Sequence, residues 1–379
     1  MKNSKVAIVG AGISGLYCAR ILADKFDVTV FEASDQIGGR INTDEYDDYR
    51  LDHGFQVFQP AYPEAQRAFD YRELDLQFFD AGANIRVGQN FYRVADPFRE
   101  PSSLISTILA PIGSPVDKLR ILKLRFVDPD DDRLLDKTTL QFLRDCGFGN
   151  QIIERFFRPF FSGVFLEREL DSPANFFAYL YRLFSISEVA VPRLGMQMLP
   201  TQLIADRQFD IRLNEHRVPK ELLSEFDYVV QAYGDGFEGF RKVTTDYFVS
   251  DTLEADRPML YLNGNPGGCI NHIAPVSRVS SSYSSGKQSL WSVNLLDKYC
   301  EIGPSEVNRE LAAWFPGHDL QHLKRYYIRK ALPKFANNAS KSIFRDGIFH
   351  CSDSESQPSI QGALIAGRRV AELISEKLY

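Results

Sequence analysis

The first forty residues constrain the fold of this chain more than any other segment. Lys5–Val9 is a short apolar run rich in β-branched residues, which predicts a buried parallel strand. The glycine-rich turn Gly10-Ala-Gly-Ile-Ser-Gly15 follows it directly, and residues 16–23 have the composition and spacing of a helix. Residues 27–31 form a second predicted strand, which ends at Glu32. These four features together predict a complete βαβ unit.

Each part of this unit has a physical role in binding a dinucleotide. Gly10 permits the tight turn after the strand, Gly12 lets backbone N–H groups approach a pyrophosphate, and Gly15 lets the helix pack closely on the sheet. The helix N-terminus stabilises the phosphate charge, and Glu32 accepts hydrogen bonds from the adenosine ribose. A glycine turn that serves packing alone does not need the terminal acid, so we favour nucleotide binding. The predicted contacts are Gly10, Ala11, Gly12, Ile13, Ser14, Gly15, Glu32 and Ala33.

The residues after Glu32 distinguish FAD from NAD as the bound dinucleotide. They run through Gly38-Gly39-Arg40, and this segment resembles the flavin-dependent amine oxidase superfamily, which includes monoamine and polyamine oxidases, protoporphyrinogen oxidases and phytoene-desaturase-like enzymes. In that family the second strand runs into the pattern E-x-x-x-x-x-G-G-R, which this chain matches completely. The resemblance implies FAD as the cofactor. Gly38 and Gly39 allow a tight backbone passage, and Arg40 offers a planar fork to the pyrophosphate oxygens.

A second motif lies near the C-terminus. Residues 347–353 are a predicted strand ending in Asp353, and residues 358–371 are a predicted helix with small residues on one face. This pattern resembles the closing FAD motif of the same family, although Ser352 stands where the family usually has glycine. The resemblance implies that Asp353 binds the ribityl chain. It also implies that the backbone from Ile360 to Ala363 faces the flavin pyrimidine, where a helix N-terminus stabilises negative charge.

Two motifs at opposite ends of the chain must converge on one cofactor, so the domain that holds it has to be discontinuous. We expect an α/β fold with a Rossmann-type FAD-binding domain in several pieces and an inserted α+β substrate domain. The expected FAD-binding domain comprises residues 1–60, 196–250 and 335–379, and the expected substrate domain comprises residues 61–195 and 251–334. Residues 211–214 and 226–232 are predicted strands that return to the FAD-binding domain, and the resemblance places the backbone of Val218 at the adenine. Residues 270–283 and 289–296 are predicted strands of an antiparallel sheet in the substrate domain.

The segment around Gly54 supplies the catalytic candidates. It resembles the part of the family that passes close to the isoalloxazine ring, and Gly54 permits that approach. His53 and Gln56 are the candidate catalytic residues, and a hydrogen-bonding role for His53 without proton transfer stays open. Amine oxidases commonly hold a water near the flavin with a lysine. That lysine is not assigned, since Lys287 lies in a turn-like context.

Composition excludes several other classes. With a formal net charge of −6, the chain has no basic footprint, so we expect no nucleic-acid partner. No signal sequence is expected, and no apolar run approaches the roughly 20 residues that span a membrane. The apolar stretches 104–112 and 156–165 are expected to be core. Five cysteines without a zinc-like grouping predict no metal site and a cytoplasmic location; they are Cys18, Cys146, Cys269, Cys300 and Cys351.

These features predict an FAD-dependent oxidoreductase that takes a hydride from a C–N or C–C bond of a small-molecule amine or apolar substrate. Two alternatives stay open. One is a dehydrogenase of a polyene or porphyrin-like substrate, similar to protoporphyrinogen oxidase or phytoene desaturase, with peripheral membrane contact. The other is an FAD-binding scaffold without turnover. The substrate, the electron acceptor and the oligomeric state have no sequence signature here.

Overall fold

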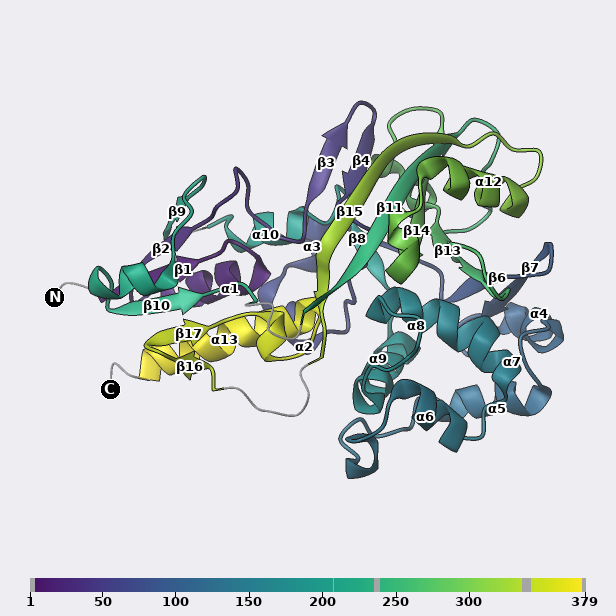
Figure 1. Ribbon diagram of the computed structural model, residues 1–379, viewed down its shortest axis with the longest axis horizontal. Coiled ribbons are helices and arrows are strands. Elements are labelled where there is room, and N and C mark those ends of the chain that lie inside the picture. Colours follow the sequence, from purple (N-terminus) through teal and green to yellow (C-terminus); the bar gives the residue numbers. More distant parts are fainter. Residues whose placement is uncertain (1–3, 207, 235–238, 336–341, 377–379) are drawn as a thin grey trace.

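Two sheets lie at opposite ends of the molecule, and a group of helices covers one side of the second sheet (Figure 1). The structure is a computed structural model that describes residues 4–206, 208–234, 239–335 and 342–376. Parts of the expected FAD-binding domain lie outside the described residues, namely 1–3, 207, 235–238, 336–341 and 377–379. The mixture of a parallel sheet, a largely antiparallel sheet and helices confirms the predicted α/β class.

The N-terminal strands belong to a six-stranded sheet with the order β16-β17-β10-β1-β2-β9. Every neighbouring pair is parallel except β16 with β17. The predicted strands 5–9 and 27–31 are confirmed as β1 and β2, and the two returning strands are confirmed as the shorter β9 and β10. The bounds are β1 Lys5–Val9, β2 Asp27–Phe31, β9 Asp210–Arg212, β10 Tyr228–Gln231, β16 Phe344–Arg345 and β17 Ile348–His350.

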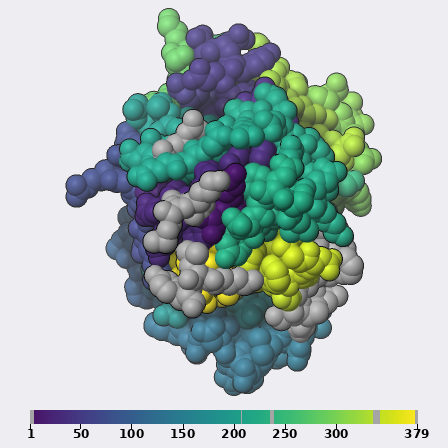
Figure 2. Space-filling model, turned by 90° about the vertical axis from the view of Figure 1, so that its left-hand side faces the viewer, coloured from purple at the N-terminus to yellow at the C-terminus, as the bar shows by residue number. Residues whose placement is uncertain are grey.

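Helices α1 (Ile13–Leu22) and α13 (Ile360–Glu376) pack on each other at this sheet. A side chain at Gly367 would place its Cβ 2.7 Å from the carbonyl oxygen of Ser14, so the two helices are in close backbone contact. Figure 2 shows the N-terminal segment (purple), the segment around residues 200–235 (teal) and the C-terminal segment (yellow) together on one face. The part of the molecule that carries the βαβ unit is therefore discontinuous in sequence.

Helix α2 (Pro63–Ala68) belongs to the same part of the molecule. It packs on α13, where Glu64 and Arg368 form an ion pair of 3.0 Å. The expected division assigned residues 63–68 to the substrate domain, because sequence alone did not show this contact. Four further short elements are β3 Thr43–Tyr46, β4 Tyr49–Asp52, α3 Tyr71–Leu74 and α10 Met198–Leu203.

The second sheet has seven strands in the order β15-β11-β14-β13-β12-β6-β7, and all neighbours are antiparallel except β12 with β6. One face packs on α12 (Pro304–Trp314) through a core that includes Trp291 and Trp314. The expected division placed residues 240–250 in the FAD-binding domain, whereas β11 pairs with β14 and β15. The bounds are β6 Gly82–Val87, β7 Asn90–Ala95, β11 Phe240–Ser250, β12 Leu260–Asn263, β13 Ile270–Ala274, β14 Ser289–Leu296 and β15 Gln321–Pro333.

The strand predicted over residues 270–283 is wrong beyond its first five residues. β13 ends at Ala274 because Pro275 cannot donate a ladder hydrogen bond, and α11 (Val276–Val279) follows it. The strand predicted over residues 289–296 is confirmed as β14. A small additional sheet joins β5 (Leu76–Phe78) to β8 (Ala190–Pro192).

The helical part contains α4 to α9 and has an aromatic core. Phe157, Phe161 and Phe177 are fully buried, and the rings of Phe161 and Phe177 lie 4.5 Å apart between centroids, so the stretch 156–165 contributes to the core as expected. The expectation for residues 104–112 is wrong for four aliphatic side chains of α4. Their exposed fractions are 46% for Leu104, 71% for Ile105, 50% for Ile108 and 74% for Leu109. The bounds are α4 Leu104–Leu109, α5 Pro115–Leu124, α6 Thr139–Asp145, α7 Asn150–Ile152, a π-helical turn Ile153–Phe157, α8 Arg158–Phe165 and α9 Ala174–Ile186.

Candidate functional site

Two glycine-rich turns lie side by side at the carboxyl ends of β1 and β2. The amide of Gly38 donates to the carbonyl oxygen of Ala11 at 2.8 Å, and Gly12 and Gly38 form an isolated parallel bridge. Gly38 has a φ of 116°, and a side chain there would place its Cβ 2.2 Å from the carbonyl oxygen of Ile41. Position 38 therefore accepts only glycine, and the hydrogen bond from its amide holds the second turn against the first.

Gly12 has a different environment, and it tests whether the turn fits a pyrophosphate. Its φ of −76° and ψ of 176° suit any residue, and a Cβ there would meet nothing closer than the carbonyl oxygen of Gly38 at 4.0 Å. Gly12 is also the N-cap of α1, yet no side chain caps that helix and no acid lies in its first turn. A helix N-terminus that no side chain caps and that borders open space is a site that a phosphate group can occupy. The residues present therefore fit the diphosphate of a dinucleotide.

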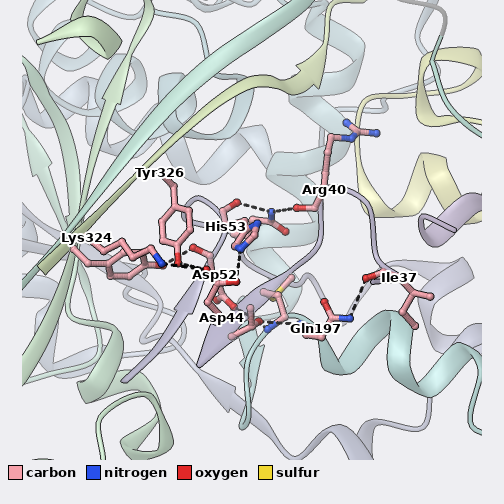
Figure 3. A network of polar contacts seen from close by, with 12 residues as sticks. Ile37, Arg40, Asp44, Asp52, His53, Gln197, Lys324 and Tyr326 are labelled. Atoms are coloured by element: carbon pink, nitrogen blue, oxygen red, sulfur yellow. Dashed lines mark hydrogen bonds and ion pairs between the residues drawn. The ribbon is translucent and has the colours of Figure 1, made fainter. Parts of the chain in front are cut away.

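A buried acceptor also lies beside the second glycine turn. The side-chain oxygen Oε1 of Gln197 is buried and has no partner among the described residues. It would lie 3.2 Å from a Cβ at Gly38, which places it beside the second glycine turn. Its amide nitrogen donates to the carbonyl oxygen of Ile37 at 3.1 Å, so the side chain is held in this orientation (Figure 3).

Glu32 ties the end of β2 to the first turn. Its Oε2 accepts from the backbone N–H of Ala11 at 2.8 Å, and its Oε1 accepts from the backbone N–H and the hydroxyl of Ser34 at 2.9 and 2.8 Å. The carboxylate is only partly buried. Val218 lies beyond β9 and is 43% exposed, in a loop that the Glu215 N–H to Glu32 carbonyl bond of 2.9 Å holds to the end of β2.

Arg40 and Asp353, which come from the N-terminal and the C-terminal motif, meet in an ion pair. Nη2 of Arg40 lies 2.5 Å from Oδ1 of Asp353, and its Nη1 donates to the carbonyl oxygen of Ala331 at 3.3 Å. Burial lowers the pKa of Arg40, but the Asp353 carboxylate raises it by more, so the guanidinium stays charged. Asp353 is 3% exposed, at the start of a short helix after β17, rather than at the end of the strand as predicted. Residues 313 positions apart thus converge on one point.

His53 belongs to a polar cluster between β3 and β15 (Figure 3). Its Nε2 lies 2.7 Å from Oδ1 of Asp44, and the other oxygen of Asp44 accepts from the hydroxyl of Tyr326 at 2.7 Å. Lys324 reaches the same oxygen at 3.5 Å. Burial raises the pKa of Asp44, but the hydrogen bonds from Tyr326 and His53 lower it by more. The net pKa of the Asp44 carboxyl is therefore below its usual value, and the group is ionised near neutral pH. A histidine held against a carboxylate in this way can accept or release a proton.

Gln56, the other catalytic candidate, has a different position. Its side-chain N–H donates to the backbone oxygens of Arg40 at 2.7 Å and of His53 at 3.2 Å. It therefore ties the backbone at Arg40 to the backbone at His53, and both hydrogen bonds of its amide nitrogen go to main-chain oxygens. Neighbouring Gly54 has a φ of 86°, a conformation that favours glycine.

Asp52 precedes His53 and anchors this segment through its side chain. It is fully buried, and its carboxylate accepts from the Thr43 hydroxyl at 2.5 Å, the Met196 N–H at 3.0 Å and the Tyr283 hydroxyl at 2.6 Å. Burial raises the pKa of Asp52, against the effect of these hydrogen bonds. A carboxylate with three internal donors thus links β4 to β3, to the turn before α10 and to Tyr283.

Sequence reasoning missed several residues of this cluster. Asp44 lies 282 positions before Tyr326, and Lys324 is two residues before Tyr326 on the same strand. They meet only because β3 packs on β15, a strand that the sequence analysis did not predict. Lys287, the lysine considered there, is exposed in the turn before β14. The alternation of apolar and basic residues along 321–333 was the available signal for β15.

No group of three or more His, Cys, Asp or Glu side chains within the described ranges is placed to hold a metal ion. No helix in the same ranges is long and apolar enough to cross a bilayer.

Comparisons with known proteins agree with this geometry. Residues 13–218 match the family model described as flavin-containing amine oxidoreductase. A chloroplastic protoporphyrinogen oxidase of Nicotiana tabacum is 33% identical over 165 residues, which are 42% of this chain and 28% of that protein. Polyamine oxidase 1 of Oryza sativa subsp. japonica is 47% identical over 57 residues, which are 14% of this chain and 11% of that protein. These matches thus span less than a third of either relative's length.

A solved structure shows that the fold is shared over the whole molecule. An oxidoreductase from Methanosarcina mazei superimposes with a TM-score of 0.71 over 97% of this chain and 100% of that chain, at 15% sequence identity. At this identity the likeness concerns the fold alone. The matched fold extends well beyond the residues that the family model covers.

Proposed function

We propose a reaction for this chain from one premise: it belongs to the family of flavin-containing amine oxidoreductases, with FAD as its cofactor. The reaction is the oxidation of a small-molecule substrate by removal of a hydride from a C–N or C–C bond. Bound FAD supplies the hydride acceptor at N5 of the flavin. The protein supplies binding, orientation and a site for the proton.

The ion pair between Arg40 and Asp353 is the observation that carries this proposal. It joins the two motifs that the family resemblance assigns to one cofactor. In the proposal, the N-terminus of α1 and Arg40 bind the pyrophosphate, Glu32 binds the adenosine ribose, and Asp353 binds the ribityl hydroxyls. Val218 lies on the adenine side, since its loop is tied to the carbonyl of Glu32. Ile360 and Ala363 at the start of α13 lie on the flavin side.

His53 and its neighbours hold the proton in this proposal. The Asp44 carboxylate orients the imidazole, so His53 takes up the proton that the substrate releases when its hydride leaves. Gln56 positions His53 by binding its backbone oxygen. Lys324 is the lysine that this site offers for holding a water, because it shares Asp44 with His53.

An apolar polyene or porphyrin-like substrate is the second candidate, and the exposed face of α4 favours it. Leu104, Ile105, Ile108 and Leu109 form an unpartnered aliphatic surface on a helix with no buried residue. Such a surface fits a lipid interface, from which an apolar substrate is taken up. Peripheral membrane contact through α4 is therefore part of this candidate.

A cytoplasmic location completes the proposal. All five cysteines lie in the described part of the chain, and all five are free thiols, as a reducing compartment favours.

The visible absorption spectrum tests the proposal directly. The protein is purified, its flavin band is recorded, and the sample is then mixed anaerobically with a panel of amines and apolar polyenes. Bleaching by one class supports turnover and chooses between the two substrate candidates. A flavin band that no compound bleaches favours the scaffold without turnover, and failure to bind FAD on reconstitution contradicts the proposal as a whole.

A further inference from the structure

A row of polar side chains crosses four strands of the seven-stranded sheet at one register. Tyr326 of β15 pairs with Thr245 of β11, Thr245 pairs with Asn294 of β14, and Asn294 pairs with His272 of β13. Paired residues point to the same face of a sheet, so the row forms one continuous polar band. The last three side chains are between 0% and 4% exposed.

The segment that contains the catalytic candidates lies over this row. The His53 ring packs on Tyr326 at 4.8 Å between centroids, the Phe55 N–H donates to the Thr245 hydroxyl at 3.1 Å, and the Phe55 ring contacts His272 at 5.1 Å. The segment is thus fixed at both ends of the row, with His53 above β15 and Phe55 above β13.

His272 is the one member of the row whose hydrogen bonding is incomplete among the described residues. Its Nδ1 lies 3.0 Å from Nδ2 of Asn271, and its Nε2 is buried without any partner in those ranges. A buried polar group without a partner costs stability, and structures retain few of them without a reason.

The neighbouring Asn271 fixes which nitrogen of His272 carries the proton. Nδ2 of Asn271 also donates to the carbonyl oxygen of Pro159 at 3.1 Å, and a carbonyl accepts only from the amide nitrogen. The same amide nitrogen therefore donates its second hydrogen to Nδ1 of His272. Since Nδ1 accepts, a neutral imidazole carries its hydrogen on Nε2. Burial lowers the pKa of His272 to about 4, so the ring is neutral near pH 7.

The orphan donor lies where the helical part meets the sheet. Helix α8 packs on β13 at this point, and a Cβ at Gly163 would lie 3.0 Å from the His272 ring. The preceding residue on α8, Ser162, also has a buried hydroxyl without a partner among the described residues. Phe55 closes the other side and contacts Phe79 at 6.0 Å. Besides the paired amide of Asn271, the ring thus has the apolar ring of Phe55 and the unpaired hydroxyl of Ser162 near it.

We propose that the Nε2–H of His272 binds the substrate by donating a hydrogen bond to a carbonyl or carboxylate oxygen on an otherwise apolar molecule. This inference rests on the proposed function, because it assigns to His272 only the oxygen-bearing end of the substrate, while the bond that reacts stays within reach of His53 at the β15 end of the row. A protonated amine has only donors, so it finds no acceptor at Nε2–H. His272 is therefore a specificity-determining residue that selects an oxygen-bearing substrate against an alkylammonium.

A matched pair of probes tests this selection. The probes are 4-phenylbutyrate and 4-phenylbutylamine, which share one apolar body and differ in the polar group. FAD content is first established from the flavin absorbance, so that failure of the proposed function is seen before any probe is added. In ¹⁵N-histidine-labelled holoprotein, the Nε2–H resonance of His272 is identified by its absence in His272→Phe. We expect 4-phenylbutyrate to shift this resonance and 4-phenylbutylamine to leave it unchanged.

Binding of the carboxylate is then compared between two variants by titrating the flavin absorbance. His272→Phe keeps the planar ring and removes the donor, and His272→Gln retains a donor N–H near the original position. We expect the Kd for 4-phenylbutyrate to rise about tenfold or more in His272→Phe and to change less than about threefold in His272→Gln. Three results would overturn the proposal. They are equal shifts by both probes, no shift with either probe at millimolar concentration, and an unchanged Kd for 4-phenylbutyrate in FAD-loaded His272→Phe.

Discussion

Replacing Gly12 by alanine separates cofactor binding from folding at the first glycine turn. The extended backbone at Gly12 suits alanine, and the new methyl group meets no atom closer than 4.0 Å. Losing glycine at an N-cap costs up to about 1 kcal/mol, and the stiffer unfolded chain offsets about 0.4 to 1 kcal/mol of that. The apoprotein of Gly12→Ala should therefore unfold within about 1 kcal/mol of the wild type.

FAD affinity should respond much more strongly. The methyl group occupies the space through which the pyrophosphate approaches the N–H groups of α1, and a hydrogen bond to a charged group contributes about 1.5 to 3 kcal/mol. Losing about 2 to 3 kcal/mol raises the Kd by roughly 30- to 150-fold. The assay is titration of apoprotein with FAD, followed by flavin fluorescence, together with thermal unfolding of the apoprotein.

Gly15→Ala is the matched control on the same turn. Its Cβ would lie 2.1 Å from the carbonyl oxygen of Gly10 and 2.9 Å from the Cβ of Ala232, so this variant should lose about 3 kcal/mol or more of folding free energy. If Gly12→Ala binds FAD within threefold of the wild type, the pyrophosphate does not lie at this turn. If it unfolds like Gly15→Ala, the separation of binding from packing is wrong.

Three further predictions follow from other parts of the structure. Glu32→Ala should weaken FAD binding by about tenfold, because the carboxylate is expected to bind the ribose as well as the Ala11 N–H; unchanged affinity in the same titration would place the ribose elsewhere. Ile105→Glu with Leu109→Glu should reduce flotation with lipid vesicles while leaving thermal stability nearly unchanged, since both side chains are exposed; equal flotation of variant and wild type would remove α4 as the contact. The pKa of His272 is about 4 in the folded state against 6.5 when unfolded, so its stability contribution is fully present above pH 6.5 and is lost as pH falls toward 4. The difference in unfolding free energy between wild type and His272→Phe should change by about 3 kcal/mol across this interval. A flat difference in urea titrations would show that His272 takes up its proton at the same pH in the folded and the unfolded state.

The nucleotide-binding part of the molecule could be predicted because its signals are local. A parallel strand needs an apolar β-branched run, the turn after it needs glycine, and the helix begins within the same few residues, so β1, α1 and β2 all follow from one continuous segment. The C-terminal motif was found for the same reason. Its strand, acid and helix are close in sequence, although the structure places Asp353 three residues beyond β17.

What only the tertiary structure decided is which distant groups meet. The Arg40–Asp353 pair joins two segments that are 313 residues apart. The contact between Asp44 and Tyr326 and the polar row that ends at His272 join residues from separate strands, and sequence spacing does not determine which segments meet. The apolar helix α4 shows the same limit. Its composition is that of a core helix, and only the absence of a covering element makes Ile105 and Leu109 exposed. Side-chain chemistry is a property of the sequence, whereas burial and partner choice depend on packing between segments that are far apart along the chain.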